Sequence, residues 1–151
     1  MKKSDIVIGG IYFVKEDNNS IIQIQKELDM NGNVEGLLYK FNEEPTLKEF
    51  NVSKISPIPI TKNLLHLLSF KEVNGNLEGL IDEHFFELKS QDIHIRIVKE
   101  KGDFCYVKKM AHSDYGCKFI RIPFLHQLQG LLASLKLPII QIVIRYAFST
   151  K

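Results

Sequence analysis

The sequence lacks most features that identify secreted, membrane-spanning or cofactor-binding proteins. It has two cysteines, Cys105 and Cys117, too few for a disulfide framework, so free thiols in a reducing cytoplasm are expected. No stretch approaches the roughly 18 apolar residues that span a bilayer, and the N-terminal stretch lacks the cleavage site of a secretory signal. Phosphate-binding glycine loops and HExxH motifs are also missing. The sequence therefore favours a cytoplasmic protein without membrane contact, cofactor or metal.

The composition is that of a folded protein with an uneven charge distribution. The 151 residues are 44% hydrophobic and 25% charged, which is typical of one globular domain or of two small lobes. Residues 96–151 carry 10 basic and 3 acidic side chains, whereas residues 1–60 carry 7 and 9 and residues 61–95 carry 3 and 6. A basic C-terminal part is a weak indication of a polyanionic partner.

Short strands are expected in the first sixty residues. Gly9 and Gly10 interrupt a run of β-branched and aromatic residues, which suggests a bulge or a sharp bend. Asn31-Gly32 is a strong type I′ hairpin signal, and Leu37, Tyr39 and Phe41 alternate onto one face beyond it. Residues 1–60 are therefore predicted to form a small bent antiparallel sheet, with an SH3-like barrel as one possible form.

The stretch "ISPIPITKNLLHLLSF", residues 55–70, predicts the start of a short helix. Its prolines enforce an extended approach. Thr61 is a good N-cap, and Ile60 and Leu65 have the spacing of a hydrophobic staple. The pattern has a complete folding explanation.

A second lobe, residues 61–151, is expected to hold an antiparallel sheet, although one continuous domain is an alternative. Residues 93–97 and 104–110 alternate around "KEKGD" and predict a hairpin, and residues 117–122 extend the sheet. Pro123 fits the first turn of a helix that packs on this sheet. In "IIQIVIRYAF" the apolar residues alternate over residues 138–148, which predicts a final strand. The fold class is therefore α+β.

Two motifs resemble a family of small proteins often encoded in prophages and mobile elements of gut anaerobes. The motifs are "PIPITKNLLHLLSF", whose short helix ends at Ser69-Phe70, and "IPFLHQLQGLLASL". Gly10, Tyr12 and Val14 precede them, and a β-rich middle separates them. The resemblance covers about residues 6–135. The chain departs from the family at Lys62 and Asn63, where acidic residues are common, and after Pro138, where the family ends in a short polar segment. No activity follows from the resemblance.

No catalytic or metal site emerges from the sequence. His112-Ser113-Asp114 has the residue types of a triad, but adjacent residues in a loop do not converge on one proton relay. Cys105, His112 and Cys117 are a possible soft-metal set, although their spacing matches no zinc motif and a fourth ligand is missing. Two strand cysteines are the commoner outcome. The protein is therefore predicted not to be an enzyme.

Two sets of side chains are candidates for binding. A basic set, interleaved with Tyr106, Tyr115 and Phe119, would suit phosphate neutralisation and base stacking if it shared one face of the sheet; it comprises Arg96, Lys99, Lys101, Lys108, Lys109, Lys118 and Arg121. The alternative is a lysine-rich surface that protects edge strands from aggregation. His126, Gln127 and Gln129 are candidates for a recognition face. The alternatives are a solvated face, or a histidine and a glutamine that hydrogen-bond neighbouring strands.

The sequence thus favours a non-catalytic binding or accessory protein of a prophage or mobile element. Its partner would be another protein, or a second copy paired through the apolar segment 138–148. The alternative is a non-specific nucleic-acid-binding module that uses the basic sheet.

Overall fold

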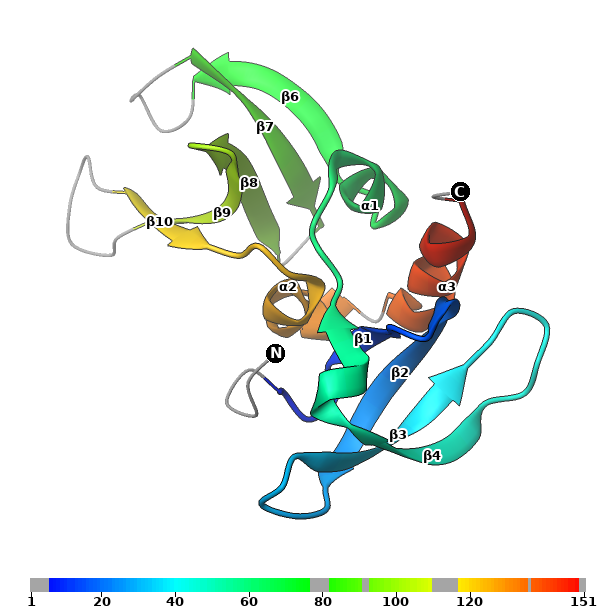
Figure 1. The fold of residues 1–151 in the computed structure, drawn as a ribbon. Helices are drawn as coiled ribbons and strands as arrows, with labels where there is room; N and C mark the ends of the chain where they lie inside the picture. The colour runs from blue at the N-terminus through cyan, green and yellow to red at the C-terminus, as the bar shows by residue number, and fades with distance from the viewer. Residues whose placement is uncertain (1–5, 77–81, 91–92, 110–116, 136, 150–151) are drawn as a thin grey trace. The chain divides into compact units, whose positions relative to one another are not determined.

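The computed structural model describes residues 6–76, 82–90, 93–109, 117–135 and 137–149 (Figure 1). The described chain forms two antiparallel sheets of five strands and three α-helices, so the predicted α+β class is confirmed. It divides into a first unit, Met1–Pro59 with Phe124–Lys151, and a second unit, Ile60–Pro123. Residues 124–151 thus belong with the N-terminal sheet, whereas the sequence placed them with residues 61–123. No described helix is long and apolar enough to cross a membrane.

The sheet of the first unit has the strand order β4-β3-β2-β1-β5. Its core residues are Ile6, Tyr12, Val14, Ile22, Ile24, Val34, Leu38, Val52 and Ile55. No barrel closes among the described strands, because β4 and β5 remain the two edges of the sheet. The strands are β1 (Ile11–Val14), β2 (Asp17–Glu27), β3 (Asn33–Tyr39), β4 (Thr46–Asn51) and β5 (Ile55–Pro57), with a 3-10 turn η2 (Val52–Lys54) before the last.

Gly9 and Gly32 have positive φ in the turns of this sheet, but the turn at Asn31-Gly32 differs from the predicted type. Gly9 has a φ of 80° and its N–H donates to the carbonyl of Ile24 at 2.7 Å, so the predicted bend is present. At Asn31-Gly32 only Gly32 has a positive φ, and the type I′ turn, which needs two, does not form. The Asp29 carboxylate instead organises a wider loop by accepting from the N–H groups of Asn31 and Asn33.

Two helices and a 3-10 turn, α2 (Leu125–Leu132), η3 (Ala133–Leu135) and α3 (Ile139–Ser149), complete the first unit. Within this unit helix α2 contacts β1 and α3 contacts β2. The predicted strand at 138–148 is wrong, because Ile139–Ser149 form the helix α3. Val143, Tyr146 and Ala147 are buried and Gln141 and Arg145 are exposed, which is the 3.6-residue period of a helix.

The second unit begins with α1 (Lys62–Leu67), as the sequence predicted. The Thr61 hydroxyl accepts from the Leu64 N–H at 3.1 Å, which satisfies one of the free donors of the first turn. The helix ends in a Schellman motif: the Phe70 N–H donates to the Leu65 carbonyl and the Ser69 N–H to the His66 carbonyl. Ser69 holds the left-handed position, with a φ of 70°.

The curved sheet of this unit has the order β10-β9-β8-β7-β6 (Figure 1). Its strands are β6 (Lys71–Asn76), β7 (Asp82–Lys89), β8 (His94–Glu100), β9 (Asp103–Lys109) and β10 (Cys117–Arg121). The predicted hairpin is β8–β9. Its two-residue turn, Lys101-Gly102, has φ values of 49° and 93°, as a type I′ turn requires.

The register of the sheet assigns each strand residue to one of two faces, because directly opposed residues of antiparallel strands share a face. We call one the Cys105 face. It carries the buried cluster Phe85, Val98, Cys105 and Val107, with the partly buried Val73 packed against it. We call the other the α1 face. It carries Phe86, Ile97, Tyr106 and Ile120, and His66 of α1 packs against Phe86 there, with ring centroids 5.8 Å apart.

Candidate functional site

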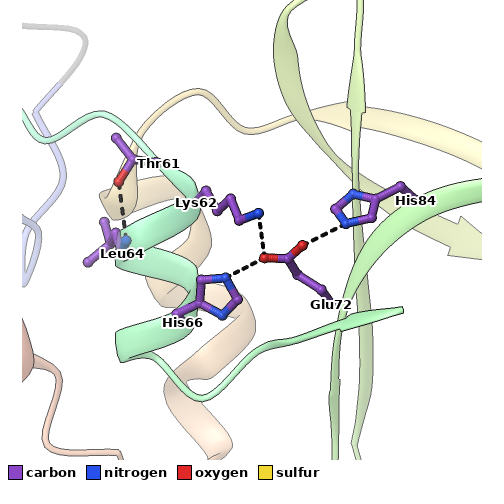
Figure 2. Close-up of polar contacts among 6 residues, drawn as sticks. All are labelled: Thr61, Lys62, Leu64, His66, Glu72 and His84. Carbon is purple, nitrogen blue, oxygen red and sulfur yellow. Dashed lines mark hydrogen bonds and ion pairs between the residues drawn. The ribbon is translucent and has the colours of Figure 1, made fainter. Parts of the chain in front are cut away.

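A polar cluster on the α1 face centres on Glu72 of β6 (Figure 2). Its Oε1 accepts from Lys62 Nζ at 2.7 Å and lies 2.6 Å from His66 Nε2, both on or beside α1. Its Oε2 lies 2.7 Å from Nε2 of His84 on β7. The Phe86 ring lies edge-on to both imidazoles, with centroids 5.8 and 5.5 Å away. One carboxylate thus links α1 to two strands.

The donors around Glu72 keep it ionised. The hydrogen bond from Lys62, followed by those from His84 and His66, lowers its pKa to about 2, against the opposing effect of desolvation. A carboxylate with so low a pKa has no proton to donate near neutral pH, and both of its oxygens are engaged. The cluster therefore holds α1 against β6 and β7. It is poorly suited to general acid catalysis.

A second polar cluster lies on the Cys105 face. Glu87 of β7 binds His94 Nε2 and accepts from Arg96 Nε at 3.2 Å, both on β8. These bonds, the one from His94 first, lower the pKa of Glu87. The guanidinium of Arg96 also lies over the Phe85 ring, 5.8 Å from its centroid. Arg96 is therefore committed within its own sheet.

The predicted basic set is divided between the two faces. Lys99, Lys108 and Lys118 lie on the α1 face, whereas Arg96 and Arg121 lie on the Cys105 face. Arg121 Nη2 pairs with Asp103 Oδ2 at 2.6 Å. Lys101 is in the β8–β9 turn, and Lys109 is opposite Cys117 in the register. Only part of the set can therefore contact one ligand surface.

Lys108 and Lys118 are directly opposed on β9 and β10, and both are exposed. Within the described residues no carboxylate lies within ion-pair distance of either side chain. Two like charges in directly opposed positions destabilise a sheet. This position is therefore favourable for an added negative charge.

The strand β10 is an edge of the sheet with exposed apolar side chains. Among the described strands only β9 pairs with it. Phe119 is 42% and Ile120 is 36% exposed, one on each face. Long, apolar edge strands promote pairing with another chain, and proteins usually protect them.

The hydrogen-bond alternation of β10 shows which backbone groups point outward. The Ile122 N–H donates inward to the Phe104 carbonyl at 2.9 Å. Because inward and outward groups alternate along an antiparallel strand, Ile120 and Lys118 also face β9. The N–H and C=O groups of Phe119 and Arg121 then point away from the sheet, at the position of a further strand.

The three candidates on the Pro123 helix are placed by contacts within the first unit. Gln129 Oε1 accepts from the Ile11 N–H at 3.0 Å, and its Nε2 donates to the Gly9 carbonyl at 3.3 Å. Gln127 Oε1 accepts from the Phe124 N–H at the start of α2. The His126 ring stacks on Tyr12 and Phe124, at 5.2 and 5.8 Å between centroids. These contacts match the packing alternative more closely than a recognition face.

The remaining chemical candidates give no centre. Cys105 is a free, buried thiol, and burial, reinforced by the charges of Glu100 and Asp103, raises its pKa. His112, Ser113 and Asp114 lie outside the described residues, as does the side chain of Cys117. In the described part of the chain, no group of three or more His, Cys, Asp or Glu side chains is arranged to hold a metal ion.

Comparisons with protein-family models, curated proteins and solved structures found no match.

Sequence reasoning missed both the Glu72 cluster and the exposed edge. Glu72, His66 and His84 come from three different elements, and only the position of His66 away from the apolar side of α1 was visible in the sequence. The edge position of β10 depends on strand order, which the alternation of a single strand does not encode.

Proposed function

We propose that this protein is a non-catalytic binding module that adds an extended segment of a partner protein to the outer edge of β10. The observation that carries the proposal is the row of outward-facing backbone groups at Phe119 and Arg121, beside the exposed side chains of Phe119 and Ile120. In strand addition the backbone supplies affinity and alternate side chains supply specificity.

The other sheet edges fit this role less well. The middle of β4 is the charged pair Lys48-Glu49, a common protection against pairing. β5 has only three residues and ends at Pro57, which cannot donate to a ladder. The second half of β6 contains Asn74 and Gly75, which are poor strand formers. The middle of β10 is instead Phe119-Ile120.

The chemistry of the polar groups supports a binding role. The Glu72 carboxylate is engaged by three donors, and the Cys105 thiol is buried with a raised pKa, so neither is a reactive group. We place the protein in a reducing cytoplasm, where a free thiol persists. From the two motifs noted in the sequence we further propose that the partner belongs to a prophage or mobile element.

Selection from a displayed library of random extended peptides tests the proposal. The full-length protein is the bait, and the peptides it enriches are then tested against Phe119→Ala and Phe119→Pro. Both variants lose the aromatic ring, but only the proline also removes the outward N–H, while every inward bond of the ladder remains. We expect the enriched peptides to bind the alanine variant and to lose binding to the proline variant. A failure to enrich peptides, or equal binding to both variants, would contradict strand addition.

A nucleic acid is the second candidate, favoured by the arrangement of Lys99, Lys108 and Lys118 on one face. Tyr106 and Ile120 lie between them on that face, so an aromatic ring on which a base could stack lies among the cationic groups. Fluorescence anisotropy with single-stranded DNA and RNA at two salt concentrations tests this candidate. Lys108→Glu combined with Lys118→Glu should abolish binding and Lys48→Glu, a control on β4, should not. Binding that is absent at low salt, or insensitive to the double substitution, excludes this site.

A further inference from the structure

We propose that the segment added to β10 is acidic, with the order acidic–apolar–apolar–acidic over four consecutive residues. This inference rests on the proposed function and names the partner that would use the same edge. It follows from the side chains that β10 presents to a neighbouring strand.

The register of β10 fixes this order. An added strand places one residue opposite each of Lys118, Phe119, Ile120 and Arg121. Directly opposed side chains interact most strongly when they are apolar pairs or opposite charges. The two middle positions therefore favour β-branched or aromatic residues and the two outer positions favour Asp or Glu. The order is the same in both directions, so parallel and antiparallel addition give one motif.

The electrostatics of both outer positions favour an anion. At Lys118 the partner's carboxylate would lie beside two cations, because Lys108 is directly opposed across the ladder. At the other end the Arg121 side chain is 68% exposed. Its guanidinium has five N–H donors, so the bond to Asp103 leaves donors for a second carboxylate.

The net charge of the strands near this edge also favours an acidic segment. The strands β8, β9 and β10 contain six basic and two acidic residues, whereas β6 and β7 contain two basic and four acidic residues. The β10 side of the sheet is therefore basic. A second copy of β10 would add its own Lys118 and Arg121 to this edge, so a partner segment of opposite charge is the better occupant.

A charge-swap experiment with synthetic peptides tests the motif. The probes are acetyl-Thr-Glu-Val-Val-Glu-Thr-amide and its counterpart with lysine in place of both glutamates, titrated into the isotope-labelled full-length protein and followed by NMR. We expect the glutamate peptide to bind at least about tenfold more tightly, and the preference to reverse in the double variant Lys118→Glu, Arg121→Glu. Lys48→Glu is the matched control, and this variant should keep the preference for the glutamate peptide.

The outcomes separate the inference from the proposed function. Equal affinity for both peptides, or a preference that the double variant does not reverse, overturns the acidic motif. If the library selection enriches peptides that depend on the Phe119 N–H but lack the two acidic positions, the motif fails and strand addition stands. If those peptides carry acidic residues three positions apart, both are supported.

Discussion

The side-chain carboxamide of Gln129 accepts a hydrogen bond from the backbone N–H of Ile11, 3.0 Å away and 118 residues earlier in the chain. Its amide nitrogen also donates to the Gly9 carbonyl. One side chain of α2 thus satisfies two backbone groups at the start of β1. The sequence left open whether Gln129 belongs to a recognition face or hydrogen-bonds neighbouring strands; in the structure it connects helix α2 to strand β1.

Gln129→Ala should therefore destabilise the protein. The substitution leaves the partly buried Ile11 N–H without its acceptor, and an unsatisfied group of this kind costs about 1–3 kcal/mol. Urea denaturation of the full chain measures the loss. Gln127→Ala is the control, because it removes only the cap contact at Phe124 and should cost about 1 kcal/mol or less. If Gln129→Ala leaves the free energy of unfolding unchanged, the hydrogen bonds of Gln129 to Ile11 and Gly9 do not stabilise the protein.

The Glu72 cluster should make stability depend on pH in acid. The pKa of Glu72 is about 2 in the folded protein against an ordinary 4.5. A depressed folded pKa gives stability that is fully present above the unfolded pKa and is lost as pH falls through the folded pKa. Glu72→Gln should be less stable than wild type at neutral pH, and the gap should close between about pH 4.5 and pH 2. Urea midpoints across this range test the prediction, and parallel curves would refute it.

Ser69→Gly should stabilise the end of α1. Ser69 has a φ of 70°, a conformation that costs an L-residue roughly 1–2 kcal/mol and costs glycine almost nothing. Part of this gain is offset because glycine has more freedom in the unfolded chain. We expect a net gain of about 0.5–1 kcal/mol in thermal or urea unfolding. Ser69→Ala retains a Cβ and should give no gain; equal effects of the two substitutions would argue against strain at this position.

Gly36→Ala should be strongly unfavourable. A Cβ at position 36 would lie 2.6 Å from the Gln23 carbonyl oxygen and 2.7 Å from Ile22 Cγ1, so β2 and β3 would have to separate. Overpacking of this kind costs about 1–3 kcal/mol. Gly75→Ala is the matched strand control, because nothing lies within 4 Å of its Cβ position. The prediction fails if both substitutions have the same effect on the urea midpoint.

The sequence predicted those elements whose signals are local. The N-cap of Thr61 and the β8–β9 hairpin depend on a few neighbouring residues, and both are present. The prediction of a strand at residues 138–148 failed because the segment fits two patterns. Ile140, Ile142 and Ile144 alternate as in a strand, whereas the buried residues Val143, Tyr146 and Ala147 have the spacing of a helix. Packing against β2 selects the helix, and this contact is invisible in a local pattern. Because Ile139–Ser149 form a helix, strand pairing between two copies no longer follows from this segment.

The candidate sites likewise depend on non-local structure that the sequence does not show. Whether Lys99, Arg96 and Lys118 share a face depends on residue parity along each strand and on the register between strands. A shift of one residue would move every side chain to the other face. The sequence therefore lists the basic residues but does not show how they group, and of the Glu72 cluster only the position of His66 could be inferred from it.

Amide hydrogen exchange along β10, measured before and after addition of the glutamate peptide, tests the central claim most directly. In the free protein the N–H groups of Phe119 and Arg121 should exchange rapidly, and that of Ile120 should be protected by β9. Addition of the peptide should protect Phe119 and Arg121 and leave Ile120 unchanged. If the Phe119 and Arg121 amides are already protected in the free protein, or stay unprotected with peptides selected for binding, β10 is not the edge that receives a partner strand.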